Sequence, residues 1–447
     1  MDGQQVIRTY MILAGMYTLA ASLIWSVNTL FLLDAGLGIG EVFIANALFS
    51  AGMVLFEIPT GVIADTMGRR ISYLASVGIL SVTTVLYLVA AQMEAGLVIF
   101  GAVSVAMGLG FTFYSGALEA WLVDGLGAVD SGADLDGVFA RGQQVSGVAM
   151  FVGTITGGFL GQIDLAVPFV VRAVLLIGVF LIARRMMVEV GFAKQPLGLG
   201  EIPALMRLQT TVGISHGWRQ PGLRLLMIVG SIQGIFTAWG FYAVQPYLLE
   251  LLDRDAVWVI GLVTAGLSVA TIAGNQIVAV LSRRCGRRTT MLLGAAGVAS
   301  ASAIAMGVTS SFAWAVGALF ALAGSMGVMS PTRQAYLHEV TSSEHRATVV
   351  SFDAMVSSVG GVGGQVGLGS VSDARSYSAG YVLGGSITVL ALPLLLRLRH
   401  IAEPADRLGP SDTAGVEGTC PAGFPRETGV NSISVPSLVA EARTEAG

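Results

Sequence analysis

GVIADTMGRR, residues 61–70, lies between two long apolar runs of this chain. A related segment, AVLSRRCGRR, occupies residues 279–288 at an offset of 218 positions. Each segment opens with a small residue and closes with Gly-Arg-Arg, and each follows one apolar run and precedes another. The return of the same charged segment at this distance predicts that the chain consists of two related halves.

Two further correspondences support the repeat. Residues 115–124 resemble residues 330–339 at an offset of 215, and Arg141 and Arg346 open the next apolar runs at an offset of 205. A longer loop in the first half, at residues 125–140, accounts for the change in offset. The predicted organisation is a first bundle, a linker, a second bundle and a disordered tail, at residues 1–188, 189–222, 223–398 and 399–447.

The composition of the chain is that of a membrane protein. Of its 447 residues, 54% are hydrophobic and 12% are charged, with a mean hydropathy of +0.76, whereas soluble domains carry about 25% charged residues. Twelve apolar runs reach or approach the length that a helix needs to cross about 30 Å of hydrocarbon. They are residues 10–33, 41–63, 71–91, 96–123, 141–162, 166–188, 223–252, 257–281, 289–309, 312–338, 347–370 and 378–398. The predicted fold class is an all-α membrane protein with twelve transmembrane helices in two pseudo-symmetric six-helix bundles.

The positions of Arg and Lys predict the orientation. If the N-terminus is cytoplasmic, the outer connections hold only Arg172, Arg254 and Arg375, and the other 21 of the 24 basic residues lie on the inner side. Because cytoplasmic loops are enriched in Arg and Lys, we expect both termini and the linker in the cytoplasm. The expected location is the plasma (inner) membrane, crossed many times.

Several classes of function lack support in the sequence. The net charge of −4 gives no basic field for nucleic acid, and two Cys and four scattered His predict no metal site. We expect no cofactor, and the sequence contains no phosphate-binding loop for ATP. It also contains no Ser/His/Asp set and no pair of acidic motifs, so we do not expect an enzyme. Energy should come from an ion or solute gradient.

Residues 61–70 resemble the cytoplasmic loop motif of the major facilitator superfamily, Gly-x3-Asp-x2-Gly-Arg-Arg. Residues 56–60, Phe-Glu-Ile-Pro-Thr, strengthen the similarity, and the twelve-helix topology extends it over residues 10–398. The resemblance implies a secondary transporter with its substrate near the midplane between two halves. It also implies a latch that closes the cytoplasmic face, formed by Gly61, Asp65, Gly68, Arg69 and Arg70.

The latch residues have expected contacts of their own. Gly61 should allow the second span to approach the eleventh, and Asp65 should accept hydrogen bonds from free N–H groups at a helix start. Arg69 and Arg70 should pair with Asp65, Asp124 or lipid phosphate. The alternative interpretation is that these charges only set the topology.

The fifth apolar run resembles a subgroup of the superfamily. Gly153-x3-Gly157-Gly158-x2-Gly161 is similar to the glycine motif of drug–proton antiporters, but Thr156 stands where those proteins carry proline. The arginine that those antiporters carry in the fourth span is also missing.

Polar and small residues recur on one face of four predicted helices. The stripes are Asn46, Ser50, Met53 and Glu57; Gly108, Thr112, Ser115 and Glu119; Thr264, Ser268, Thr271 and Asn275; and Asp353, Ser357, Gly360 and Gly364. A polar face in so apolar a chain indicates contact with water or protein rather than lipid. For the glycines and serines, the alternative is tight packing between helices.

Ionisable groups inside spans are rare and usually face a cavity, which makes them candidates for proton coupling. We predict Glu119 as the first candidate, with Arg141 as its partner, because a carboxyl group in low-dielectric surroundings can exchange a proton near neutral pH. Glu57 is the second candidate and Asp353 a further one. The alternative is a set of permanent ion pairs, namely Glu119 or Asp124 with Arg141, and Glu339 with Arg333 or Arg346.

The resemblance implies that the first, fourth, seventh and tenth spans face the cavity. The predicted substrate contacts are their polar and aromatic residues, Tyr17, Trp25, Asn28, Phe31, Thr112, Ser115, Gln233, Phe236, Thr237, Trp239 and Gln245. Such a lining suits a mostly apolar organic solute. No arginine stands mid-span on these helices, which disfavours a strongly anionic substrate.

The predicted function is secondary active transport of a small organic, mostly apolar solute by alternating access. We expect proton-coupled efflux, an antiport, by a monomer in the lipid bilayer. Proton-coupled or facilitative uptake of a nutrient or metabolite is the alternative within transport. A polytopic membrane enzyme and a transporter-like receptor are the alternatives outside it.

Overall fold

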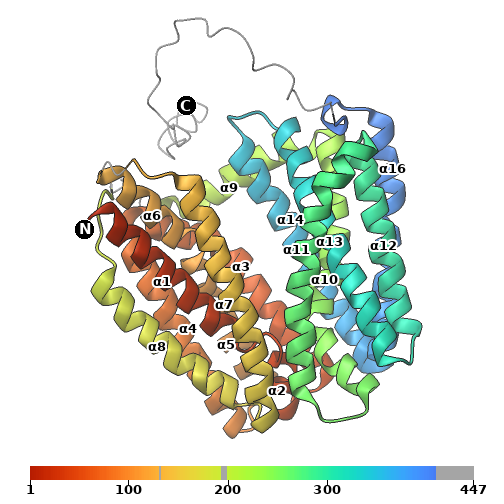
Figure 1. The fold of residues 1–447 in the computed structure, drawn as a ribbon, viewed down its shortest axis with the longest axis horizontal. Coiled ribbons are helices and arrows are strands. Elements are labelled where there is room, and N and C mark those ends of the chain that lie inside the picture. Colours follow the sequence, from red (N-terminus) through yellow and green to blue (C-terminus); the bar gives the residue numbers. More distant parts are fainter. Residues whose placement is uncertain (130–131, 193–198, 409–447) are drawn as a thin grey trace, which may run out of the picture.

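The computed structural model describes residues 1–129, 132–192 and 199–408, and these residues are almost entirely helical (Figure 1). The first group of helices is α1 (Gly3–Ser22), α2 (Asn28–Asp34), α3 (Ile39–Met67), α4 (Arg69–Gln92), α5 (Leu97–Tyr114), α6 (Ala117–Ala128), α7 (Leu135–Ile163) and α8 (Val167–Met186). A connecting segment follows, with a 3-10 turn (Leu199–Glu201), α9 (Ile202–Val212) and a π-helical turn (Gly213–Trp218). The second group is α10 (Pro221–Leu252), α11 (Val257–Cys285), α12 (Arg288–Val308), α13 (Phe312–Val340), α14 (Arg346–Ala374), α15 (Tyr377–Val389) and α16 (Ala391–Ile401), with a last 3-10 turn (Pro404–Asp406).

All twelve predicted spans are helical. Within the described part of the chain, ten helical segments are long and apolar enough to cross a membrane, and the chain is therefore a multi-pass membrane protein. The first and eleventh predicted spans fall outside these ten. The first is interrupted at residues 23–27, between α1 and α2, and the eleventh, α14, is rich in Gly and Ser. Length and hydropathy thus establish ten of the twelve spans.

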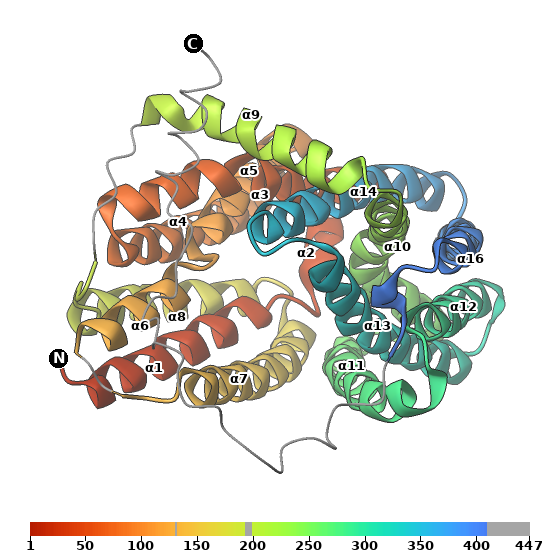
Figure 2. The same cartoon turned by 90° about the horizontal axis from the view of Figure 1, so that it is seen from above.

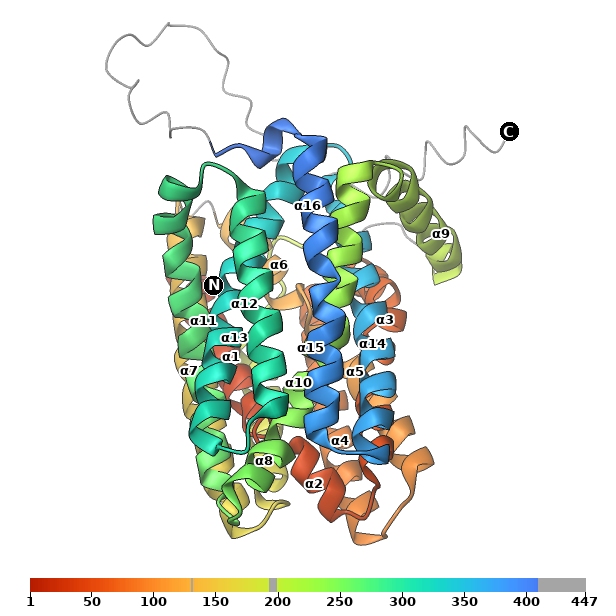
Figure 3. The ribbon, with the colours of Figure 1, turned by 90° about the vertical axis from the view of Figure 1, so that its right-hand side faces the viewer.

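The two groups stand side by side, with α1 to α8 in one and α10 to α16 in the other (Figure 1). The N-terminus and the end of α16 lie at the same end of the molecule, which we call the terminal face. The other end, which carries α2 and the connection at residues 253–256, is called the opposite face. Helix α9 runs along the terminal face from the first group to α10, as the views from above and from the side show (Figures 2 and 3).

Close packing of glycines joins the groups toward the opposite face. A methyl group added to Gly158 of α7 would lie 2.7 Å from the Cα atom of Gly261 of α11. Gly153, one turn earlier, lies against α1, where an added methyl group would be 2.8 Å from the Leu19 carbonyl oxygen. Small residues allow such approach of helix backbones in membranes. The antiporter-like glycine motif of the fifth span is a packing seam in this structure.

The two halves end with the same kind of contact. After α8, the Glu189 carboxylate accepts hydrogen bonds from the backbone N–H groups of Arg69 and Arg70, at 3.2 and 2.9 Å. After α16, the Asp406 carboxylate accepts from the backbone N–H and the hydroxyl of Thr289, at 2.8 and 2.9 Å. Each acid therefore caps the helix that begins the third span of its own half.

An ion pair is also repeated. Arg69 at the start of α4 lies 3.7 Å from Asp124 of α6, and Arg288 at the start of α12 pairs with Glu339 of α13. The predicted pairing of Glu339 with Arg333 or Arg346 is therefore wrong. These matched contacts are what an internal repeat of two helix bundles predicts.

The predicted disordered tail at residues 399–447 is wrong for its first residues. α16 continues to Ile401, and Asp406, which is 1% exposed, folds back onto α12. This turn places the Asp406 carboxylate that caps α12, which explains why the residues after α16 are ordered. Residues 409–447 lie outside the described residues.

Candidate functional site

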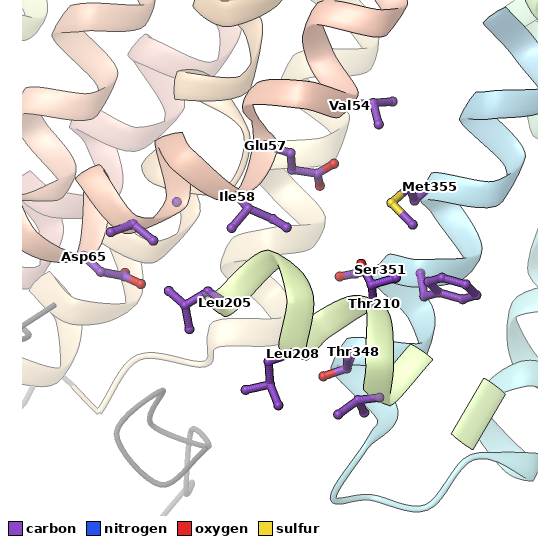
Figure 4. A pocket seen from close by; sticks show the side chains of 14 residues that line it. Val54, Glu57, Ile58, Asp65, Leu205, Leu208, Thr210, Thr348, Ser351 and Met355 are labelled. Carbon is purple, nitrogen blue, oxygen red and sulfur yellow. The ribbon is translucent and has the colours of Figure 1, made fainter. Parts of the chain in front are cut away.

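Three cavities follow the predicted polar stripe of α3. The entrance cavity, of about 330 Å³, lies between α3, α9 and α14 and is lined by Glu57, Asp65, Leu208 and Ser351 among others (Figure 4). The middle cavity, of about 380 Å³, shares Glu57 with the entrance cavity and is lined by residues of α3, α10 and α14. In Figure 4 the carboxylate of Glu57 points from α3 into the entrance cavity.

The third cavity lies deeper, mostly within the first group, and Phe241 and Tyr242 of α10 complete its wall. It has a volume of about 220 Å³, shares Met53 with the middle cavity, and includes Asn46 of the same α3 stripe. We call it the Arg172 cavity, after the charged residue in its wall. Shared lining residues place the three cavities in series, from α9 toward the opposite face. All four residues of the predicted stripe at positions 46, 50, 53 and 57 line this series.

Hydrogen bonds between the two groups close the series at the opposite face. The backbone N–H of Thr29 donates to the side-chain oxygen of Gln245 at 2.8 Å, and the amide nitrogen of Gln245 donates to the Trp25 carbonyl oxygen at 2.9 Å. The Thr29 hydroxyl donates to the carbonyl oxygen of Tyr242, also at 2.9 Å. Gln245 is fully buried by these contacts. The prediction that Gln245 contacts substrate does not fit this conformation, in which it fastens α10 to the break between α1 and α2.

The predicted latch residues form a network within the first group. Arg69 pairs with Asp65 at 2.6 Å and with Asp124 at 3.7 Å, as predicted. Arg70 instead donates to the carbonyl oxygen of Arg184, at 2.8 Å. Gly68 adopts a φ of 112°, and a methyl group there would lie 2.7 Å from the Glu189 carboxylate. Glycine thus makes room for the acid that caps α4.

Two expectations for the latch are wrong in this conformation. Glu189, not Asp65, accepts the N–H groups at the start of α4. Gly61 does not touch the eleventh span, since a methyl group added to it would meet nothing within 4 Å. The reason is that the entrance cavity separates α3 from α14 at this level.

The proton-coupling candidates lie in different surroundings. Glu57 lines two cavities and forms no ion pair with a described residue. Glu119 is exposed in the first turn of α6, after a helix break at Gly116, where φ is 73°. Arg141 is also exposed, and the predicted ion pair between Glu119 and Arg141 is absent among the described contacts. The break redirects α6, so the stripe that runs through α5 does not continue to Glu119.

Asp353 has a partner that the sequence did not indicate. It is 6% exposed and pairs with Arg333 of α13, which also donates to the Leu226 carbonyl oxygen at 3.2 Å. This buried pair joins three helices of the second group. It stands outside the cavity series described above.

The predicted substrate contacts divide into three sets. Tyr17, Trp25 and Asn28 line the Arg172 cavity, and Thr237 lines the middle cavity. Phe31, Phe236 and Trp239 are buried in apolar cores. The remaining polar residues pack elsewhere: Thr112 is buried and bonds to the Leu109 carbonyl oxygen, Ser115 ends α5, and Gln233 donates to the sulfur of Met329. Their positions do not support a direct substrate contact in this conformation.

Arg172 is the residue that sequence reasoning misplaced. It was assigned to an outer connection, but it lies in the second turn of α8, 5% exposed, in the wall of the cavity that bears its name. Asn46 and Tyr242 line the same cavity. A signal was present, since Arg172 falls inside the run 166–188 rather than between runs. Among the described residues, no three His, Cys, Asp or Glu side chains come together as metal ligands.

Comparisons with known proteins agree with this architecture. The sequence model of the Major Facilitator Superfamily matches residues 241–427, which cover most of the second bundle and part of the segment after it. No curated protein matches the sequence.

Several solved structures share the fold. The nucleoside transporter NupG superposes with a TM-score of 0.74 at 11% identity, over 88% of this chain and 99% of that one. A POT family transporter in complex with a thioalcohol-conjugated peptide gives 0.66 at 11% identity, over 89% and 96%. The human organic anion transporter MFSD10 gives 0.61 at 15% identity, over 88% and 100%. At these identities the likeness establishes only that the chain shares the fold of these transporters.

Proposed function

We propose that this chain is a secondary transporter of the major facilitator superfamily that moves a small organic solute by alternating access. The observation that carries the proposal is the series of cavities between the terminal face and a fastened opposite face. Such an arrangement is one of the two states that an alternating-access carrier needs. The fold of the solved neighbours, which are transporters, favours transport over catalysis.

The two halves are proposed to rock as units, residues 1–188 against residues 223–398, with residues 189–222 as the linker. Opening of the opposite face would break the bonds of Gln245, and closure of the terminal face would bring α3 toward α14. The latch at residues 61–70 would then reach the second half. We propose that the terminal face is cytoplasmic and that the protein works as a monomer in the plasma (inner) membrane.

We propose Glu57 as the residue that carries a coupling proton. It lines both the entrance and the middle cavity and has no ion-pair partner among the described residues, so water in the cavities can deliver a proton to it. Ionisable groups within spans are usually functional. Glu119 remains a second candidate, since closure of the terminal face changes the surroundings of α6.

Efflux is the direction that we propose, because aromatic walls and the glycine motif of α7 suit export of apolar compounds. Uptake is a second candidate. Thr156 in place of proline and the packing role of the glycines favour it, because they weaken the similarity to antiporters.

Proteoliposomes loaded with a pH-sensitive dye test the proposal. A panel of organic solutes is added under an imposed pH gradient, and we expect a subset to collapse the gradient with the wild-type protein but not in protein-free liposomes. Glu57→Gln should abolish the collapse and preserve downhill exchange of labelled solute. Glu94→Gln, an exposed acid outside the cavities, is the matched control. If no solute moves in either assay, the transport proposal is wrong.

The same vesicles distinguish the directions. With the terminal face outward and an acidic lumen, an exporter accumulates solute as protons leave, whereas a proton symporter expels it. If Glu57→Gln keeps wild-type proton coupling and Glu119→Gln loses it, Glu119 and not Glu57 carries the coupling proton.

A further inference from the structure

Arg172 is a buried charge without a partner. Its side chain belongs to the wall of the Arg172 cavity and is 5% exposed, and its Nε atom makes no hydrogen bond. No Asp or Glu forms an ion pair with it, and none lines the cavity, in the part of the chain that the structure describes. A charged group removed from water at such a place is costly unless it is paired. The cavity therefore lacks one negative charge.

The polar groups that line the cavity beside Arg172 are hydroxyls and amides, which carry no charge that could neutralise the guanidinium. The Tyr17 hydroxyl is buried in the same wall without a hydrogen bond of normal geometry, although Ser76 lies close to it. Tyr17 is held in place by Tyr114, whose ring stacks on it at 3.6 Å between centroids. The Asn28 amide donates to Asn46 at 3.1 Å, so that pair is already satisfied.

We infer that the Arg172 cavity binds the anionic head of the transported solute, and that this solute is a small organic monocarboxylate with a flat apolar body. That the bound solute is also transported rests on the proposed function. The inference is compatible with the expectation from sequence that a strongly anionic substrate is disfavoured, because a monocarboxylate carries a single charge.

A single negative charge is the best match to the site. A planar guanidinium binds a carboxylate through two parallel hydrogen bonds, and the Tyr17 hydroxyl can donate a third. One arginine neutralises one charge, so a dianionic phosphate ester would leave a charge uncompensated within the membrane.

The shape of the cavity limits the rest of the solute. Trp25, Phe49 and Phe111 supply aromatic walls on the side of the first group, and Phe241 supplies one from α10. The volume of about 220 Å³ lies below the range of roughly 300–1,000 Å³ typical of drug-sized ligands. A body of about one aromatic ring fits these limits.

Both halves of the chain contribute to the wall of the cavity, so both would contact a solute bound there. Tyr242 and Phe241 of α10 complete the wall, and the Trp25 and Phe241 rings meet edge to face at 6.4 Å. The carbonyl oxygens of Trp25 and Tyr242 accept the bonds that fasten the opposite face. A solute bound at Arg172 would thus lie next to the hydrogen bonds that must break when the opposite face opens.

Binding of benzoate and of its neutral analogue benzamide to the purified full-length protein tests the inference. Affinity is measured by the shift in melting temperature and by tryptophan fluorescence, in buffer with gluconate as the bulk anion. We expect saturable binding of benzoate, at least tenfold weaker binding of benzamide, and weaker binding of phenyl phosphate than of benzoate. Arg172→Gln should weaken benzoate binding at least tenfold and Arg172→Lys less. Arg185→Gln, an exposed arginine of the same helix, should bind like wild type.

Several results would overturn the inference. They are equal affinity for benzamide and benzoate, unchanged benzoate binding by Arg172→Gln, the absence of saturable benzoate binding, and equal protection by chloride, which would assign the site to an inorganic anion. If Arg172→Gln does not fold, the wild-type comparison of the two probes and Arg172→Lys decide the matter. These assays measure binding without transport. Benzoate binding by a protein that moves no solute in liposomes would therefore refute the transport proposal and leave the anion site in place.

Discussion

The backbone N–H of Thr29 donates a 2.8 Å hydrogen bond to the side chain of Gln245, 216 positions away in the other half of the chain. The same glutamine donates to the Trp25 carbonyl oxygen from its amide nitrogen. One side chain therefore satisfies two backbone groups that the break between α1 and α2 leaves without helical partners.

Gln245→Ala should loosen the opposite face. Loss of two buried hydrogen bonds, at about 1 kcal/mol each, shifts the balance between conformations by roughly 30-fold. Distances between spin labels on residues 34 and 254, in a protein without its two native cysteines, should lengthen in a larger fraction of molecules. Gln162→Ala is the control, since Gln162 also crosses between the groups, to the Asp255 carbonyl oxygen, but at an exposed site. Unchanged label distances in Gln245→Ala would show that the glutamine does not fasten this face.

Gly158→Ala should force α7 and α11 apart. The added methyl group would lie 2.7 Å from the Gly261 Cα atom, and relief of such overlap costs about 1–3 kcal/mol. We expect a lower melting temperature and a transport rate reduced at least tenfold. Gly147→Ala on the same helix meets nothing within 4 Å and should be neutral or slightly stabilising. Equal melting temperatures for the two variants would contradict close packing of α7 against α11 at Gly158.

Asp65→Asn should weaken the latch while the protein still folds. The pair with Arg69 is already present with the terminal face open, so the loss that matters is the contact that Asp65 is proposed to make with the second half on closure. A partly exposed contact of this kind contributes about 0.6 kcal/mol, or roughly a threefold change in the population closed at the terminal face. Spin labels on residues 67 and 343 would report that population. Asp136→Asn, an exposed acid of α7, provides the comparison. A variant with wild-type label distances and transport rate would leave Asp65 only a topological role.

Glu189→Ala and Asp406→Ala should destabilise the protein by similar amounts. Each removes the carboxylate that caps a third-span helix, at a cost of about 1–2 kcal/mol. Thermal unfolding measures both, and Glu201→Ala, an acid of the linker turn, is the control. A loss confined to one of the two variants would mean that the repeated contact is not energetically equivalent.

The sequence predicted the helices from the length of the apolar runs and the α3 stripe from its periodicity. Residues 46, 50, 53 and 57 share a face of any helix that contains them, and that face lines the cavities. The interruption of the first span could not be predicted, since residues 23–27 are apolar except for Ser26 and contain neither Gly nor Pro. It depends on Gln245, which is far away in the sequence.

Two errors at the site concern Arg172 and Glu119. Arg172 lies six residues into an apolar run, where the sequence does not distinguish a helix end from a buried position. Glu119 matched a stripe that ends at Gly116, because a positive φ redirects the chain there. Burial within the folded chain decided the place of Arg172, and the backbone conformation at Gly116 decided that of Glu119.

The unpaired charge of Arg172 also determines how the membrane potential acts on the carrier. With a monocarboxylate bound, the site is electrically neutral, and the loaded protein changes conformation with little work against the field. The empty protein carries one positive charge through the same movement. A charge that crosses the whole field is worth about 2.3 kcal/mol per 100 mV, and the charge of Arg172 contributes the fraction of the field through which it moves. Voltage would therefore govern the return of the empty carrier rather than the step that moves the solute.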